Sequence, residues 1–193
     1  MISRVGVLCL ALLVTATSAH AEVRRWVPTS GKSHVWFSAS FPLGDFTGRT
    51  EDVTGEFQTD AGDLRQGVTG TLRVRAATLR TGMDGRDRDM RQALDVETHP
   101  EIRFVLQVVE PSFNSITETA DVLLVIRGLL VIRGVERPMT LPGRVRFRSD
   151  RLWVRGESTL RMTDFGITPP RRLFLAVRYE IAVAFDVTLH PEE

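Results

Sequence analysis

The C-terminal stretch from Leu173 to Leu189 alternates between large apolar residues and other residues without interruption. A period of two over this length is typical of a long β-strand with one buried face and one face in water, and it does not fit the 3.6-residue period of a helix. The residues expected on the inward face are Leu173, Leu175, Val177, Tyr179, Ile181, Val183, Phe185, Val187 and Leu189.

Shorter runs of the same alternation occur along the rest of the chain. Many such strands, separated by turn residues and with few helical patterns, predict an all-β antiparallel sandwich or barrel. No shift in composition marks a second domain, so one domain is expected. The predicted strands are Val35–Phe41, Val53–Thr59, Val68–Thr78, Ile102–Val108, Val122–Ile132, Met139–Phe147 and Leu152–Met162.

The hexapeptide LLVIRG is written twice in succession, from Leu123 to Gly134. An offset of six preserves the phase of a strand, because six is a multiple of two. The apolar residues at 124, 126, 130 and 132 then share one face, and Arg127 and Arg133 share the other. We therefore predict a long strand, bent at Gly128 where glycine permits a kink or bulge.

One helix is predicted at about Gly85 to Leu94. Met90 and Leu94 are four residues apart, acidic residues occur near the start, and a proline follows the end. The acidic residues Asp84, Asp87 and Asp89 do not follow a calcium-binding loop pattern. A solvated helix start is therefore favoured over a cation site.

The first 21 residues have the three parts of a secretory signal peptide. Arg4 is followed by the apolar run Val5–Val14 and by the small-x-small sequence Ala19-His20-Ala21. The apolar run is well short of the ~20 residues that span a bilayer, although a retained signal anchor is the alternative. We therefore expect a periplasmic or secreted protein whose mature domain, residues 22–193, has no transmembrane segment.

The mature chain offers little to an enzyme. Removal of the peptide leaves 24 basic and 24 acidic residues, which argues against nucleic-acid binding, and it removes the only Cys. The three remaining histidines, His34, His99 and His190, are far apart and lack metal-ligand spacing, and no G-x-S-x-G sequence occurs. No catalytic, metal or cofactor site is predicted.

The feature of the sequence that remains to indicate a function is its apolar surface. Ten Phe and three Trp are many for an all-β chain of this size, and several Phe residues stand at inward positions. They could fill a solid core, or they could line a cavity, since an eight-stranded barrel can hold one small ligand. Periodicity does not separate these two possibilities.

Several sequence blocks resemble the YceI-like family. The stretch TLRTGMDGRDRDMRQALDVETHPEIRF (Thr78–Phe104) is similar to its Thr-Gly, Arg-Asp helix and Pro-x-Ile-x-Phe signature, and GLLVIRGVERPMTL (Gly128–Leu141) is similar to the next block. Phe46-Thr47-Gly48 and Asp164-Phe165-Gly166-Ile167 resemble its early and late elements. The blocks occur in family order, although Asp89 replaces the usual His after Arg-Asp and Met162 the usual Arg before Asp-Phe-Gly.

The resemblance implies an extended eight-stranded antiparallel lipocalin-like barrel with one short inserted helix. It implies a non-catalytic protein that sequesters or carries a polyisoprenoid or other long-chain isoprenoid or fatty lipid in an apolar tunnel, and it leaves a homodimer possible. Phe46 and Phe165 are then expected at the rim, and Arg86 either meets an anionic head group or forms a structural salt bridge. The expected lining is Phe37, Phe57, Leu72, Val74, Phe104, Leu106, Tyr179, Ile181 and Phe185.

Two other functions stay open at this point. One is a stress-response or interaction module with a filled core and a functional exterior. The other is an enzyme that acts on a lipid held in the cavity. The volume of the cavity tests the first, because a filled barrel leaves no room for a lipid chain. The second requires a cluster of buried titratable groups at the tunnel mouth.

We predict that the mature protein begins at Glu22, because the small-x-small site ends at Ala21. N-terminal sequencing of the exported protein checks this prediction. A protein that still begins with Met1 would show that the segment is retained.

Overall fold

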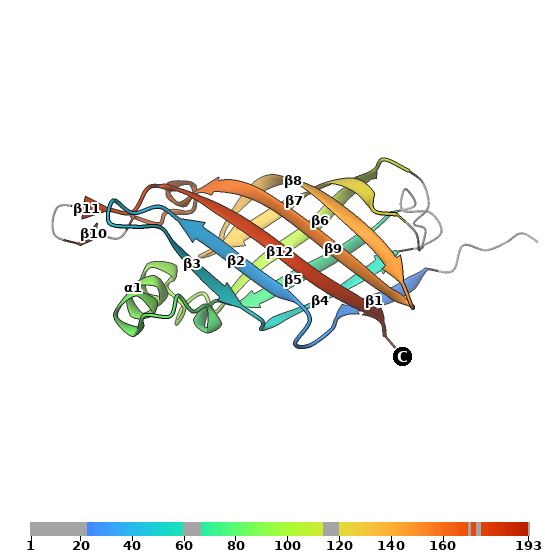
Figure 1. The fold of residues 1–193 in the computed structure, drawn as a ribbon, viewed down its shortest axis with the longest axis horizontal. Coiled ribbons are helices and arrows are strands. Elements are labelled where there is room, and N and C mark those ends of the chain that lie inside the picture. The colour runs from blue at the N-terminus through green and yellow to red at the C-terminus, as the bar shows by residue number, and fades with distance from the viewer. Residues whose placement is uncertain (1–22, 60–66, 114–119, 170, 173–174, 193) are drawn as a thin grey trace, which may run out of the picture.

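The computed structural model describes residues 23–59, 67–113, 120–169, 171–172 and 175–192, so the expected signal peptide lies outside it. The described residues form β-strands and one α-helix (Figure 1). The elements are β1 (Arg24–Pro28), β2 (His34–Ala39), β3 (Phe46–Thr50), β4 (Val53–Thr59), β5 (Thr69–Arg75), η1 (Ala76–Thr78), α1 (Asp84–Leu94), β6 (Glu101–Pro111), β7 (Val122–Ile132), β8 (Val135–Arg148), β9 (Arg151–Arg161), η2 (Met162–Phe165), β10 (Arg171–Arg172), β11 (Leu175–Ala176) and β12 (Glu180–Pro191).

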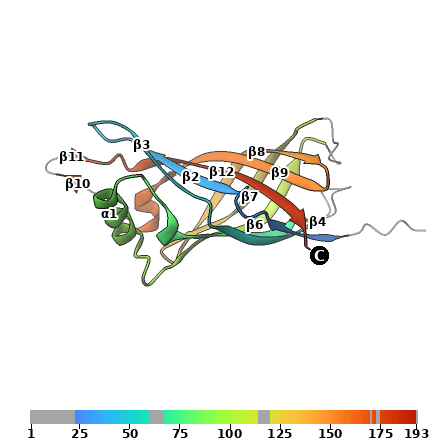
Figure 2. The same cartoon turned by 60° about the horizontal axis from the view of Figure 1, so that its bottom comes forward.

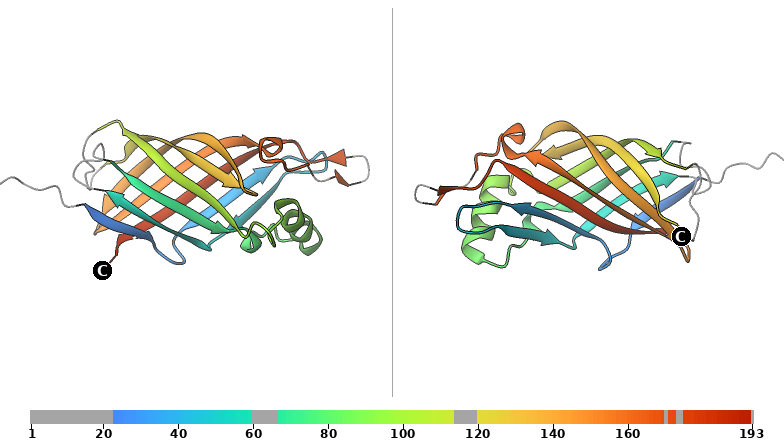
Figure 3. Two further views of the ribbon diagram at one scale, coloured as in Figure 1. Left: turned by 180° about the vertical axis from the view of Figure 1, so that it is seen from behind. Right: turned by 45° about the horizontal axis from the view of Figure 1, so that its top comes forward.

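The strands form a closed antiparallel barrel. The sheet order is β1-β4-β5-β6-β7-β8-β9-β12, and β1 pairs back onto β12 to close a ring of eight strands. β2 and β3 lengthen the ring at one end, because β2 pairs with β12 and β3 pairs with β2. The barrel is elongated, and α1 and the β10–β11 hairpin lie at the end opposite the C-terminus (Figures 1, 2 and 3). The predicted fold class is confirmed, and the predicted helix matches α1 within one residue.

A serine completes the wall where β1 ends and β2 begins. Thr188 of β12 faces this gap, and its backbone carbonyl accepts a hydrogen bond of 2.7 Å from the backbone N–H of Thr29. The fully buried Ser33 hydroxyl accepts from the Thr188 N–H at 3.3 Å. The same hydroxyl lies 3.2 Å from the Thr29 carbonyl and 3.3 Å from the Thr188 carbonyl, to which it can donate. The barrel therefore keeps its backbone groups satisfied across an interruption in the strand.

The duplicated hexapeptide forms β7 and the turn after it. The apolar residues at 124, 126, 130 and 132 are all buried, as predicted. The register shifts between Leu106 and Val108 of β6, opposite Gly128, so the bulge lies in the partner strand rather than in β7 itself. Arg133 does not share the outer face of the strand with Arg127. It forms the two-residue turn into β8 with Gly134, where both residues have positive φ.

The C-terminal alternation does not form one uninterrupted strand. β10 and β11 pair with each other as a separate two-stranded sheet, and β12 begins only at Glu180. From there, Val187 and Leu189 are buried, whereas Leu173 lies outside the described residues. The inward face was therefore predicted correctly for β12 and for Val177, which lines the barrel cavity, but not for Tyr179, which is exposed.

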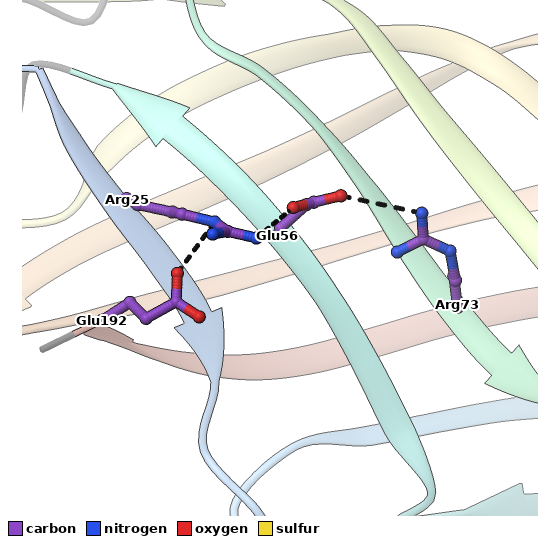
Figure 4. Close-up of polar contacts among 4 residues, drawn as sticks. All are labelled: Arg25, Glu56, Arg73 and Glu192. Carbon is purple, nitrogen blue, oxygen red and sulfur yellow. Dashed lines mark hydrogen bonds and ion pairs between the residues drawn. The ribbon is translucent and has the colours of Figure 1, made fainter.

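Exposed ion pairs cross the outside of the barrel at the place where it closes. Arg25 of β1 contacts Glu192 at 2.8 Å and Glu56 of β4 at 2.5 Å, and Glu56 also contacts Arg73 of β5 at 3.8 Å (Figure 4). Pairs as exposed as these contribute at most about 1 kcal/mol each to the free energy of unfolding. They support the closure, but they do not create it.

The half of the barrel away from α1 is packed solid. Trp26 of β1 is almost fully buried, and Phe147 of β8 meets it edge-on, with ring centroids 6.4 Å apart. The buried residues around Trp26 are Val53, Val74, Leu106, Val122, Leu124, Ile126, Leu141, Val145, Leu152, Val187 and Leu189.

Within the described residues, no helix is both long enough and apolar enough to cross a membrane.

We predict that Ser33→Ala lowers the free energy of unfolding by about 1–3 kcal/mol, because it leaves the buried N–H of Thr188 without a partner. Ser38→Ala is the matched control. Its hydroxyl bonds Thr47 at the surface, so the expected loss is within about 0.5 kcal/mol. Urea unfolding of both variants measures the two effects, and equal losses would show that Ser33 does not complete the wall.

Candidate functional site

An apolar cavity of about 460 Å³ occupies the half of the barrel next to α1. Arg86 and Asp89, both on α1, are the only charged residues among the described residues that line it. The remaining lining residues are Val35, Trp36, Phe37, Ala39, Phe41, Leu43, Gly44, Phe46, Val74, Leu79, Met83, Gly85, Met90, Ala93, Leu94, Ile102, Phe104, Leu130, Ile132, Met139, Leu141, Leu160, Met162, Ile167, Val177, Ile181, Val183, Ala184 and Phe185.

The mouth of the cavity lies between α1 and the β2–β3 hairpin. The guanidinium carbon of Arg86 lies 4.0 Å from the ring centroid of Phe46, a cation–π contact. Phe46 in turn meets Phe37 edge-on at 6.2 Å. Among the described residues, no ion pair is formed by Arg86, whose Nη2 instead lies 2.8 Å from the sulfur of Met83. Within the part of the chain that the structure describes, no carboxylate contact therefore neutralises the positive charge at the mouth.

A buried carboxylate fixes α1 to the loop that precedes it. Oδ1 of Asp87 accepts hydrogen bonds from the backbone N–H of Thr81 at 2.7 Å and from its hydroxyl at 2.6 Å. Burial raises the pKa of Asp87, but these bonds and the charges of Arg80 and Arg91 outweigh burial and hold the pKa below its ordinary value. The prediction of a solvated helix start was thus wrong for Asp87, because the Thr81 donors compensate its burial.

Aromatic rings lie against the barrel wall where the neighbouring strand has glycine. A Cβ on Gly156 of β9 would lie 2.7 Å from Cε1 of Phe185, its direct partner on β12. A Cβ on Gly128 would lie 2.6 Å from Cζ of Phe104. Because these glycines carry no side chain, the rings occupy the wall, and the space at the centre stays open.

Seven of the residues singled out in the sequence do line this cavity. Five come from the expected tunnel lining and two from the expected rim. They are Phe37, Val74, Phe104, Ile181, Phe185, Phe46 and Arg86.

Four others face the interior but do not line the cavity. Phe57, Leu72 and Leu106 belong to the packed half around Trp26. Phe165, expected at the rim, is buried in a cluster with Met162 and Ile167, which themselves line the cavity. Alternation assigns a residue to a face but does not give its height along the barrel, and this accounts for the displacement.

Tyr179 lies on the outside of the molecule, which corrects the expectation that it lines the tunnel. It is 52% exposed, and its ring lies 5.7 Å from the guanidinium carbon of Arg161. Its carbonyl accepts a hydrogen bond from the N–H of Met162 at a bend just before β12. Because Tyr179 lies outside the strand, the alternation does not govern its side chain.

Sequence reasoning missed the part of the lining that α1 and the hairpin tip supply. Met90, Ala93 and Leu94 place one face of the helix against the cavity. Leu43 and Met83 stand at the mouth, 80% and 51% exposed. The four-residue spacing of Met90 and Leu94 predicted an apolar helix face, but no sequence signal indicated what that face would cover.

Comparison with known proteins places this geometry among related folds. The family described as the YceI-like domain matches residues 26–189. The crystal structure of BcnA from Burkholderia cenocepacia is similar, with a TM-score of 0.70 at 15% identity, and covers 83% of this chain and 98% of its own. A polyisoprenoid-binding domain from Saccharophagus degradans, implicated in plant cell wall breakdown, also gives 0.70 at 15%, over 89% and 100%.

The YceI protein of Campylobacter jejuni has a TM-score of 0.60 at 15% identity, over 76% of this chain and 84% of its own. No curated protein matches the chain significantly. At such low identity, these structures show a shared fold.

We predict that Asp87→Asn lowers the free energy of unfolding by about 1–2 kcal/mol at neutral pH, since hydrogen bonds to a charged group are stronger than those to a neutral one. The folded-state pKa is lowered, so this contribution is present above the unfolded pKa of about 3.9 and is lost as the pH falls through the folded value. The difference between parent and variant should therefore shrink below about pH 4.

The exposed Asp89, on the same helix, supplies the control variant Asp89→Asn. Its stability should stay within about 0.5 kcal/mol of the parent across the pH range. Denaturant unfolding at a series of pH values measures all three proteins. A gap for Asp87→Asn that persists unchanged to pH 2 would contradict the role assigned to its charge.

Proposed function

The chain belongs to the YceI-like domain family, and we propose that it binds a long-chain isoprenoid or fatty lipid inside its barrel. The observation that carries this proposal is a 460 Å³ cavity whose lining is apolar except for two charges at one end. An interior of this kind suits an alkyl or prenyl tail and offers nothing to a strongly polar molecule. The similar Saccharophagus degradans domain, described as polyisoprenoid-binding, supports the same ligand class.

The cavity favours lipid binding over a module with a filled core. Only the half of the barrel around Trp26 is filled, and the half next to α1 has room for a ligand. Each methylene group that leaves water for an apolar site contributes about 0.8 kcal/mol to binding, so a short stretch of chain suffices for high affinity. The mechanism is sequestration: the tail leaves water, and no covalent step is needed.

The head of the ligand belongs at the mouth beside Arg86. A guanidinium without an ion-pair partner among the described residues can meet a carboxylate or phosphate. Asp89 is the other titratable group in the lining, and these two residues do not form a nucleophile and base pair. We accordingly propose a carrier or store for lipid rather than an enzyme that modifies it.

The site of action in this proposal is the periplasm or the exterior of the cell. The signal-peptide pattern of residues 1–21 supports it. An apolar chain has to cross water outside a membrane, and a barrel that encloses the chain makes that possible.

We predict that protein purified without detergent carries such a lipid and that Ile181→Arg abolishes the loading. Ile181 lines the cavity from β12, and an unpaired guanidinium there is costly enough to block ligand entry or to perturb folding. Mass spectrometry of organic extracts measures the loading, and thermal melts report whether the variant is folded.

Arg178→Glu is the matched control, three residues away. Arg178 is exposed and contacts Ser40 through its backbone N–H, so loading and stability should equal those of the parent, within about 0.5 kcal/mol. If extracts of the parent hold no lipid and fluorescent long-chain probes fail to bind, the proposed function is wrong. If both variants stay loaded, the assigned cavity is wrong.

A further inference from the structure

The cavity extends along only part of the barrel. β7 contributes Leu130 and Ile132 to the cavity, while Val122, Leu124 and Ile126 of the same strand belong to the packed half. The division repeats on β12, where Val187 and Leu189 are packed but the cavity is lined by Ile181, Val183, Ala184 and Phe185. The same boundary crosses opposite walls, so the cavity has a floor.

Two rings lie against the wall at the level of this floor. Phe104 of β6 and Phe185 of β12 both line the cavity and pack against the cluster around Trp26. Each ring already lies over a glycine of the next strand, Gly128 or Gly156, so it is placed against the wall. Beyond the rings, Leu106 and Trp26 are buried in the packed half. A ligand tail that reaches Phe104 and Phe185 therefore meets filled space.

The volume above the floor limits the length of tail that the barrel can enclose. At roughly 30 Å³ for each group the size of a water molecule, 460 Å³ holds about 15 such groups. A methylene group is of similar size. Carbons beyond that number remain in water at the mouth and gain no transfer free energy.

We propose that the ligand is a single-chain amphiphile whose enclosed tail is limited to about 15–20 carbon atoms by the floor at Phe104 and Phe185. The chemical class is a fatty acid, or an isoprenoid of three to four prenyl units, rather than a polyisoprenoid of many units. This inference rests on the proposed function and adds a length limit to it.

A chain-length series on the lipid-free full-length mature protein tests the limit. Saturated fatty acids of 10 to 24 carbons, and prenyl alcohols of 15, 20 and 40 carbons, compete with a bound fluorescent fatty acid. Affinity should rise by about fourfold per methylene in the shorter acids and level off at about 15–20 carbons. The 40-carbon alcohol should bind no more tightly than the 20-carbon alcohol.

The outcomes separate this inference from the proposed function. A steady rise to 24 carbons, or tighter binding of the 40-carbon alcohol, overturns the length limit and leaves lipid binding intact. Failure of every chain length, together with failure of the fluorescent probe, overturns lipid binding itself.

Variants locate the floor independently. Phe185→Ala, and Phe104→Ala on another wall, should move the plateau to chains longer by a few carbons, because each opens space below the present floor. Phe147→Ala removes a ring from the packed half and should leave the plateau where it is. An unmoved plateau in folded Phe185→Ala and Phe104→Ala overturns the assignment of the floor. If neither variant folds, the series on the unmodified protein still decides the limit.

Discussion

Strand β12 carries hydrogen bonds along both of its edges, and the closure of the barrel depends on this. One edge pairs with β9 over most of its length, while the other pairs first with β2 and then with β1. Where β2 and β1 leave a gap, Ser33 and Thr29 satisfy the backbone of Thr188. Without that closure the sheet would have two edges, and the inward apolar residues would have no common interior to fill or to line.

The same inward residues produce two different interiors because of their sizes and neighbours. Around Trp26, rings and branched side chains meet across the barrel and exclude space. Next to α1, the lining includes the small residues Ala39, Ala93 and Ala184, and rings lie against the wall over glycine. The cavity is therefore a property of side-chain volume, and it exists within a wall whose backbone pairing is continuous.

The alternation in the sequence was enough to predict the longer strands, their inward faces and the all-β class, because a period of two leaves a half-buried strand little alternative. The short strands β1 and β3 were not among the predicted strands. The spacing of Met90 and Leu94 was enough for the helix. Height along the barrel was not predictable, since Leu106 and Phe104 have the same phase and differ only in what packs beneath them. Tyr179 and Asp87 were misplaced because one lies just outside a strand and the other is buried by contacts with Thr81. In both cases the cause lies in the surrounding structure and not in the residue's own position in the sequence pattern.

The interruption between β3 and β4 has a consequence for how the barrel opens. On the side towards α1, and within the described residues, a backbone bridge joins β3 to the segment after β5, and in it Arg49 and Arg80 exchange two hydrogen bonds of 2.9 Å. The hydroxyls of Thr50 and Thr78 add a third hydrogen bond of 2.7 Å. Breaking these three hydrogen bonds costs about 1.5–4.5 kcal/mol, less than the free energy needed to unfold a whole domain. The amides of Arg49 and Arg80 should then exchange with solvent through a frequent local opening, while those of β12 wait for global unfolding. If the proposed ligand enters through this opening, its rate of entry is uncoupled from the lifetime of the folded barrel.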